Sequence, residues 1–274
     1  MKNITLLICI VFTFIACGKE EFHISNLNNN KIIVLGHGGM GKTNIYPMNS
    51  FESIMNCLFS GADGTEIDVQ MTKDSVLVAY HDQKLEDNTN LSGTINSKNW
   101  AEIQNATYQN AAYLHYSIVS LNEIFSNIPN LHSYKFTFDT KLYIENSDTI
   151  QFYHTYSNAI EGIIKKFNLE NNIFIESEDT AFLKIMKIKS PDYKLFFYPK
   201  LFEKGFEIAT NLELYGISIS TDIVSKEQIE IAHANNLLVA VWSINSQKAN
   251  KEAIQKNPDF IQTDKLENLL KLLE

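Results

Sequence analysis

The chain has 274 residues, 45% hydrophobic and 20% charged, which suits one globular domain of the size that is ordinary for a barrel enzyme. Its formal net charge of −9 argues against a broad nucleic-acid interface, since such an interface needs a basic patch. No nucleic acid is therefore expected as a partner.

The N-terminus is typical of a bacterial lipoprotein. Lys2 precedes an apolar run, Ile4 to Ala16, that is too short for the roughly 20 residues of a membrane-spanning helix, and the run ends at Cys17. We expect a signal peptide over 1–16 and lipidation of Cys17, which predicts a lipid anchor in the bacterial cell envelope, at the outer membrane, with surface exposure left open. The alternative is an ordinary secretory signal in which Cys17 is incidental.

The domain follows this leader after a short polar segment. Residues 17–30 lack hydrophobic periodicity and predict a flexible tether, so the domain occupies 31–274. Its first apolar run, 31–36, is typical of a buried strand, and it ends at His37 and a glycine-rich turn. Functional groups of α/β enzymes are commonly placed in such a position.

Two acids and a second histidine follow among alternating apolar residues. Glu66 and Asp68 are two residues apart in a predicted strand, so both carboxylates point to one face in a spacing typical of metal ligands. The next apolar run is close enough to return as an antiparallel hairpin, and a turn at Lys73-Asp74 would place Glu66 opposite His81. The alternative for a Glu-x-Asp pair is a solvated strand face.

Strands and helices then alternate to the C-terminus. Strands are predicted at 63–70, 75–80, 134–140, 172–176, 193–198, 214–219, 237–242 and 259–262, and helices at 149–167, 179–189, 200–210, 225–235, 247–256 and 264–273. The alternation predicts a TIM-type (β/α)8 barrel, slightly irregular because strand 75–80 is surplus, with an insertion over 83–118. Functional groups of such barrels lie at the carboxyl ends of strands. Four candidates meet that condition: His37, Glu66, Asp68 and Asp139.

Several short motifs carry a family resemblance. They are His37-Gly-Gly39, Pro47-Met-Asn49-Ser50, Gly61-Ala-Asp63, Glu66-Ile-Asp68, Thr72-Lys-Asp74, His81-Asp82, Asp139-Thr-Lys141, Trp242-Ser-Ile-Asn245 and Gln262-Thr-Asp264. In this order and spacing they resemble the glycerophosphodiester phosphodiesterase family, a group of TIM-barrel enzymes. The resemblance covers residues 32–266, nearly all of the predicted domain.

The resemblance implies a metal-dependent enzyme. It assigns a divalent cation to Glu66 and Asp68, with Asp139 as the third ligand, and it places Lys141 on the phosphate of the substrate. Asp139 stands where the family has glutamate, one methylene longer, and a shorter ligand suits calcium better than magnesium because magnesium demands strict geometry. An exposed acid and base is the alternative for Asp139 and Lys141.

The resemblance also suggests the remaining site residues. His37 and His81 would share the proton transfers, and Trp242 matches a tryptophan that borders the family's site, although it suits the barrel core equally well. Gly38 replaces the family's arginine, so a bidentate hydrogen-bonded contact to the phosphate is missing. Lys42 is placed to reach the anion instead. Met48 likewise replaces a glutamate.

A small phosphodiester is therefore the expected substrate. We predict hydrolysis of glycerophosphodiesters to an alcohol and glycerol phosphate by general acid and base catalysis. Two alternatives stay open: a lysophospholipase D-type lyase that forms a cyclic phosphate, and a surface binding module without activity.

Overall fold

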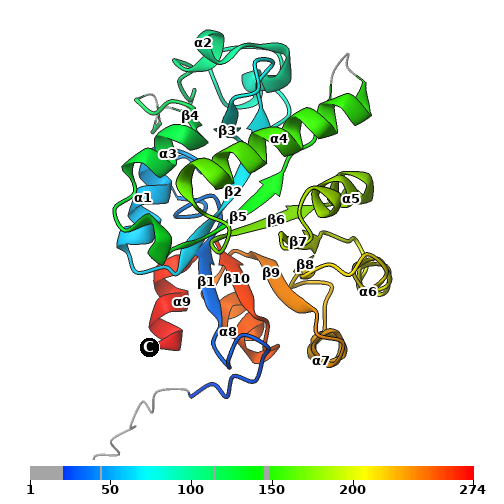
Figure 1. The fold of residues 1–274 in the computed structure, drawn as a ribbon. Coiled ribbons are helices and arrows are strands. Elements are labelled where there is room, and N and C mark those ends of the chain that lie inside the picture. Colours follow the sequence, from blue (N-terminus) through cyan, green and yellow to red (C-terminus); the bar gives the residue numbers. More distant parts are fainter. Residues whose placement is uncertain (1–20, 44, 111, 114, 145–147) are drawn as a thin grey trace, which may run out of the picture.

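The structure, a computed structural model, describes residues 21–43, 45–110, 112, 113, 115–144 and 148–274. Parallel strands in these residues form a closed ring of eight, in the order β1-β10-β9-β8-β7-β6-β5-β2 (Figure 1). They are β1 (Ile33–Gly36), β2 (Gly64–Met71), β5 (Lys135–Thr140), β6 (Ile173–Ser177), β7 (Lys194–Phe197), β8 (Gly216–Ser220), β9 (Leu238–Ile244) and β10 (Phe260–Thr263). Pairing of β1 with β2 closes the ring, which confirms the predicted TIM-type barrel.

Helices connect the strands and surround the ring (Figure 1). They are α1 (Phe51–Phe59), α3 (Leu121–Asn127), α4 (Thr149–Phe167), α5 (Thr180–Lys189), α6 (Phe202–Asn211), α7 (Lys226–Ala234), α8 (Gln247–Gln255) and α9 (Leu266–Leu273), with a 3-10 turn, η3 (Leu131–Ser133), before β5. Six begin at a serine or aspartate whose side chain accepts a hydrogen bond from the backbone N–H three residues later. These caps fix where the loops that precede these six helices end. No helix in the described residues is long and apolar enough to cross a membrane.

Two apolar layers leave one end of the barrel for polar groups. A large cluster lies between strands and helices, and a smaller one fills the inside of the ring with Leu35, Phe174, Phe196, Ala240 and Phe260. Further along β6 and β10, the next residues that face the inside of the ring are Glu176 and Gln262, both buried and polar. The barrel is thus packed toward its amino end and polar toward its carboxyl end, which is where TIM barrels hold their sites.

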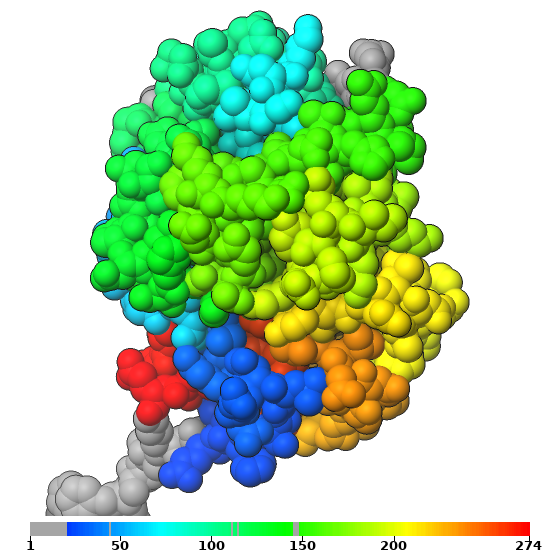
Figure 2. All heavy atoms as spheres, in the orientation of Figure 1, coloured from blue at the N-terminus to red at the C-terminus, as the bar shows by residue number. Residues whose placement is uncertain are grey.

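The insertion forms a small unit with its own core. It contains β3 (Leu77–Ala79), α2 (Trp100–Ile103), β4 (Val119–Ser120) and the 3-10 turns η1 (Leu85–Asp87) and η2 (Ile95–Ser97). β3 pairs antiparallel with the last residues of β2, outside the ring, as predicted for the surplus strand. Its apolar cluster centres on Tyr80, Leu85, Ile95, Ile103 and Tyr108. In Figure 2 this unit covers one end of the molecule.

The hairpin register differs from the prediction by one residue. Val69 pairs with Ala79 and Gln70 with Val78, so the register puts His81 opposite Ile67 instead of Glu66. The cause is the loop: the Ser75 N–H donates to the Thr72 carbonyl and Ser75 adopts φ 65°, so the turn contains three residues instead of two. The predicted contact between Glu66 and His81 is wrong.

Part of the segment predicted as a tether contacts the barrel. The Ser25 N–H donates to Asn257 Oδ1 at 3.1 Å, Asn26 donates to the Pro258 carbonyl at 2.8 Å, and the Asn28 N–H donates to Asp259 Oδ1 at 3.1 Å. These partners precede β10, so the segment is held against the amino end of the barrel, at the opposite end of the molecule from the insertion (Figure 2). The proposed signal peptide and Cys17 lie outside the described residues.

Candidate active site

Three carboxylates meet at the mouth of the barrel. Glu66 and Asp68 lie on the inner side of β2, whereas Ile67 and Val69 pack into the helix-facing core. Asp139 on β5 is the register partner of Asp68. Oxygen atoms of the three carboxylates lie within 4.8 Å of one another, so the residues predicted as metal ligands come together.

The loop between β1 and α1 orients these acids. Asn49, which adopts a positive φ of 64°, donates to Asp68 Oδ2 at 2.6 Å and accepts from the Asp68 N–H at 2.9 Å. The Gly38 N–H donates to Glu66 Oε2 at 2.8 Å. Sequence reasoning gave Asn49 no role beyond its motif, because the contact joins the loop to a strand 19 residues away.

The site is suited to a cation. Burial, together with Asp68 and Asp139, raises the pKa of Glu66 well above its ordinary value. Burial also raises the pKa of Asp139, although Lys141 opposes the shift. The second oxygen of Glu66, Oε1, is buried and has no hydrogen-bond partner in the described part of the chain. A divalent cation would neutralise these charges and bind that oxygen, so the residues present fit a metal.

Lys141 lies directly beside the acids. Its Nζ is 3.0 Å from Asp68 Oδ1 and 2.6 Å from Asp139 Oδ2, and its side chain is only 16% exposed. Burial works against the charged amine, but the two carboxylates outweigh it and raise its pKa. The same charge lowers the pKa of Asp68 against the effect of burial. Lys141 is therefore a fixed cation at the position predicted for phosphate binding.

Both predicted histidines line one pocket of about 420 Å³. His37 Nδ1 lies 2.8 Å from Asp264 Oδ1, and His81 Nδ1 lies 2.7 Å from Asp82 Oδ1. His81 is 55% exposed and His37 is 26% exposed. Each imidazole thus has its Nδ1 held by a carboxylate and its Nε2 left for a substrate atom.

A further buried acid lies next to the site. Glu176 on β6 is the register partner of Asp139, and one of its oxygens accepts from Gln262 Nε2 at 2.7 Å. Burial, with Asp139 as a further cause, raises the pKa of Glu176 to about 7. Its other oxygen is buried without a partner among the described residues. No sequence motif marks this residue, but its place at the end of a predicted strand was a usable signal.

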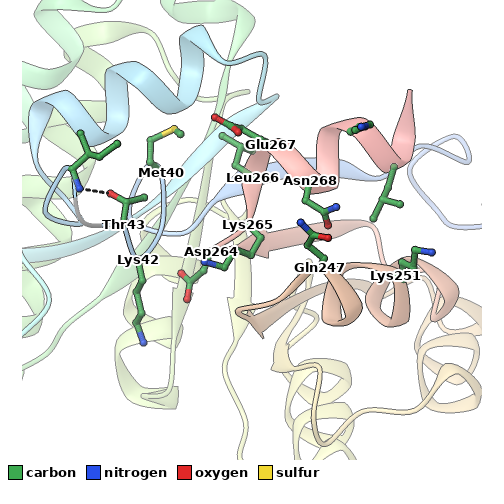
Figure 3. Close-up of a pocket in the computed structure, with 13 residues that line it drawn as sticks. Met40, Lys42, Thr43, Gln247, Lys251, Asp264, Lys265, Leu266, Glu267 and Asn268 are labelled. Carbon is green, nitrogen blue, oxygen red and sulfur yellow. Dashed lines mark hydrogen bonds between the residues drawn. The ribbon is translucent and has the colours of Figure 1, made fainter.

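Trp242 and Lys42, the remaining predicted site residues, lie on opposite sides of the barrel mouth. Trp242 is half-buried and lines a second pocket, of about 640 Å³, together with Asp139, Lys141 and Tyr198, so it belongs to the wall of the site rather than the barrel core. Lys42 lines the histidine pocket and also a larger groove of about 810 Å³ between the β1–α1 loop and α8–α9. Figure 3 shows Lys42 and Asp264 at one end of that groove and Lys251 at the other.

Comparison with known proteins agrees with this geometry. Residues 37–268 match the model of the glycerophosphoryl diester phosphodiesterase family. The chain is 25% identical over 236 residues to a glycerophosphodiester phosphodiesterase of Bacillus altitudinis, covering 84% of this chain and 94% of the relative. It is 26% identical over 247 residues to a protein of the same name from Caldanaerobacter subterraneus, covering 89% and 98%.

The fold is shared with solved structures. One is an Oleispira antarctica phosphodiesterase in complex with the product sn-glycerol-3-phosphate, which matches with a TM-score of 0.73 at 17% identity, over 88% of this chain and 96% of that one. The family model spans all the acids and histidines described above. The chain belongs to the glycerophosphoryl diester phosphodiesterase family and is an enzyme of this class.

Proposed function

We propose that the protein hydrolyses glycerophosphodiesters to an alcohol and glycerol phosphate, using His37 and His81 as its general acid and base. Two histidines, each held by a carboxylate, lie at the same barrel mouth as a cluster of three carboxylates that Lys141 contacts. This arrangement is the observation that supports the proposal. The product complex of the Oleispira antarctica protein supports a small glycerol phosphate ester as the ligand of this fold.

The phosphate would bind between the acids and the lysine. Glu66, Asp68 and Asp139 would hold the divalent cation, which neutralises the non-bridging phosphate oxygens when bound. Lys141 adds a second positive charge to the phosphate. Because Asp68 and Asp139 already anchor its amine, this charge is in place before the substrate arrives.

The histidines would move the protons. Nε2 of one imidazole takes the proton of the attacking hydroxyl, and Nε2 of the other gives a proton to the departing alkoxide. Asp264 and Asp82 each hold Nδ1 of one ring, which leaves Nε2 for the proton transfers. The attacker is either water or the neighbouring hydroxyl of the substrate, and the second route yields a cyclic phosphate.

We further propose calcium as the preferred ion. Asp139 is short and its carboxylate is shared with Lys141, so the ligand set is less regular than magnesium requires. The test is the variant Asp139→Glu, which restores a longer ligand. It should improve activity with magnesium more than activity with calcium. An unchanged ratio of the two activities would contradict the assignment.

The activity itself is tested on residues 18–274. Several glycerophosphodiesters are incubated with calcium, with magnesium and with chelator, and the products are identified by phosphorus NMR. Open-chain glycerol phosphate with metal, and none with chelator, supports the proposal. A cyclic phosphate as end product identifies the lyase instead, and no turnover of any diester supports the binding module.

A further inference from the structure

Four polar side chains form one complete layer inside the barrel. β2, β6, β8 and β10 are alternate strands of the ring, and their registers bring the inward residues Glu66, Glu176, Ser218 and Gln262 to one level. TIM barrels fill their interior with such layers of four, mostly from bulky apolar residues. Here all four residues are polar and buried, and the apolar filling lies beneath them.

Two carboxylate oxygens of this polar layer have no partner. Glu66 Oε2 accepts from the Gly38 N–H at 2.8 Å, and Glu176 Oε1 accepts from Gln262 Nε2 at 2.7 Å. The second oxygen of each, Glu66 Oε1 and Glu176 Oε2, is buried without a hydrogen-bond partner in the described part of the chain. An ionised oxygen buried in this way is unfavourable, so the layer requires a positive group that satisfies it.

The protein itself supplies too little positive charge for four acids. Lys141 pairs with Asp68 and Asp139, and no ion pair joins it or another lysine to Glu176 among the described residues. A divalent cation and Lys141 together balance three carboxylates, so the carboxylate of Glu176 is in excess. Buried carboxylates of this kind are found paired or bound to a metal. The cation at Glu66 is the positive charge that Glu176 can share.

The neighbouring ligand makes room for a further one. Asp139 is the register partner of Glu176, and its short carboxylate is also engaged by Lys141 at 2.6 Å. β2, β5 and β6 are consecutive strands of the ring (Figure 1). The acids of these three strands therefore surround one region of the barrel mouth, with Glu66 on one side of Asp139 and the longer side chain of Glu176 on the other.

We propose that Glu176 is a fourth carboxylate ligand of the divalent cation, which it binds through Oε2. This inference rests on the proposed metal-dependent function and adds a residue to its metal site. It also favours calcium, because calcium accepts roughly six to eight oxygen ligands, whereas magnesium keeps several of its waters.

Calorimetric titration of the protein with calcium tests the assignment without turnover. Glu176→Gln should weaken calcium binding at least roughly tenfold and magnesium binding less. Glu176→Asp keeps the charge but withdraws the oxygen by one methylene, and it should weaken binding as well. Glu178→Gln, at an exposed acid two residues further on, is the control and should bind calcium as the wild type does. Wild-type affinity in Glu176→Asp would indicate attraction at a distance and contradict ligation.

Terbium in place of calcium gives a direct readout of the ligands. The luminescence lifetimes of bound terbium in light and heavy water report how many waters it coordinates. Glu176→Gln should gain coordinated water, because solvent fills the position that the carboxylate leaves, whereas Glu178→Gln should not. In chelator, Glu176→Gln should melt no lower than the wild type, since it removes a buried acid that then lacks its cation. A lower melting temperature there would indicate a structural role and count against the proposal.

The outcomes separate this inference from the proposed function. Equal calcium affinity and equal hydration of terbium in the wild type and Glu176→Gln would show that Glu176 is no ligand, and the proposed function would stand. A wild-type protein that binds no divalent ion would refute the metal-dependent function together with this inference.

Discussion

Asp264 holds His37 through a contact of 2.8 Å between Oδ1 and Nδ1, although 227 residues separate them. His37 follows the first strand of the barrel and Asp264 follows the last, so the contact joins the carboxyl ends of the paired strands β1 and β10. Burial alone would lower the pKa of this imidazole. The hydrogen bond and the charge of Asp264 outweigh burial and raise it above 6.5.

Asp264→Asn should therefore lower the pKa of His37, because burial is then opposed only weakly. A pH titration of the ring protons by NMR measures this, with Asp222→Asn as a control that leaves the His37 titration in place. Because the pKa of His37 is raised in the folded protein, its contact with Asp264 stabilises the folded state when the imidazole is protonated. This stabilisation is fully present below pH 6.5, the unfolded value, and is lost as pH rises through the folded pKa. The variant should lose stability at acidic pH and little at alkaline pH, and a uniform loss would contradict the pairing.

Glu66→Ala, Asp68→Ala and Asp139→Ala should each weaken divalent-ion binding, because the three carboxylates offer oxygens within 4.8 Å. Calorimetric titration with calcium measures the effect. Affinity in the wild type should fall as pH decreases, since the raised pKa of Glu66 makes protons compete with the ion. The exposed acid Glu230, replaced by glutamine, is the control. A triple variant that binds calcium as tightly as the wild type would show that the site is elsewhere.

His37→Ala and His81→Ala should each reduce turnover by something like 10²–10⁴-fold, the usual contribution of a general acid or base. Metal affinity should change little, because neither imidazole is within the carboxylate cluster. The double variant should lose less than the product of the single losses, as expected for groups acting in one step. Full activity in either single variant refutes the assignment.

Gly38→Arg should destabilise the protein without improving activity on small diesters. Gly38 has φ +56°, and a Cβ atom there would lie 3.0 Å from two carbons of Met48. A left-handed conformation costs roughly 1–2 kcal/mol for a residue with a side chain. Urea unfolding of Gly38→Ala measures the strain alone, and Gly38→Asn, which tolerates this conformation better, should lose less. An arginine variant that keeps the wild-type melting temperature and gains activity would show that the loop is permissive.

Cys17→Ser should release the protein from the membrane fraction, because a lipidated cysteine is the anchor that the sequence predicts. Fractionation of cells that express each form measures this. Cys57→Ser, at a buried cysteine of α1, is the control and should stay with the membrane. Retention of the Cys17 variant would point to another means of attachment.

Much of this architecture could be predicted from local patterns. The alternation of apolar strands with capped helices gave the barrel, because each βα unit is encoded within a short stretch. The acids on β2 were found by their two-residue spacing. The hairpin register was missed because the left-handed turn residue is Ser75, and nothing local distinguishes it from an ordinary serine.

The contacts that complete the site were harder to predict. Asp264 and Asn49 act through partners that only barrel closure or the β1–α1 loop brings near. Glu176 belongs to no sequence motif, and it lies beside Asp139 because β5 and β6 pair in register. Pairings inside the insertion rest on isolated bridges and 3-10 turns, which leave no periodic pattern in the sequence.

The docking of Ser25, Asn26 and Asn28 beneath β10 determines how the enzyme would be oriented on a surface. These residues lie at the amino end of the strands, and the carboxylates lie at the other end. A lipid at Cys17 would therefore hold the barrel with its mouth turned away from the bilayer. An enzyme anchored in this way would meet diesters from the solution side, and the lipid would keep it near the membrane.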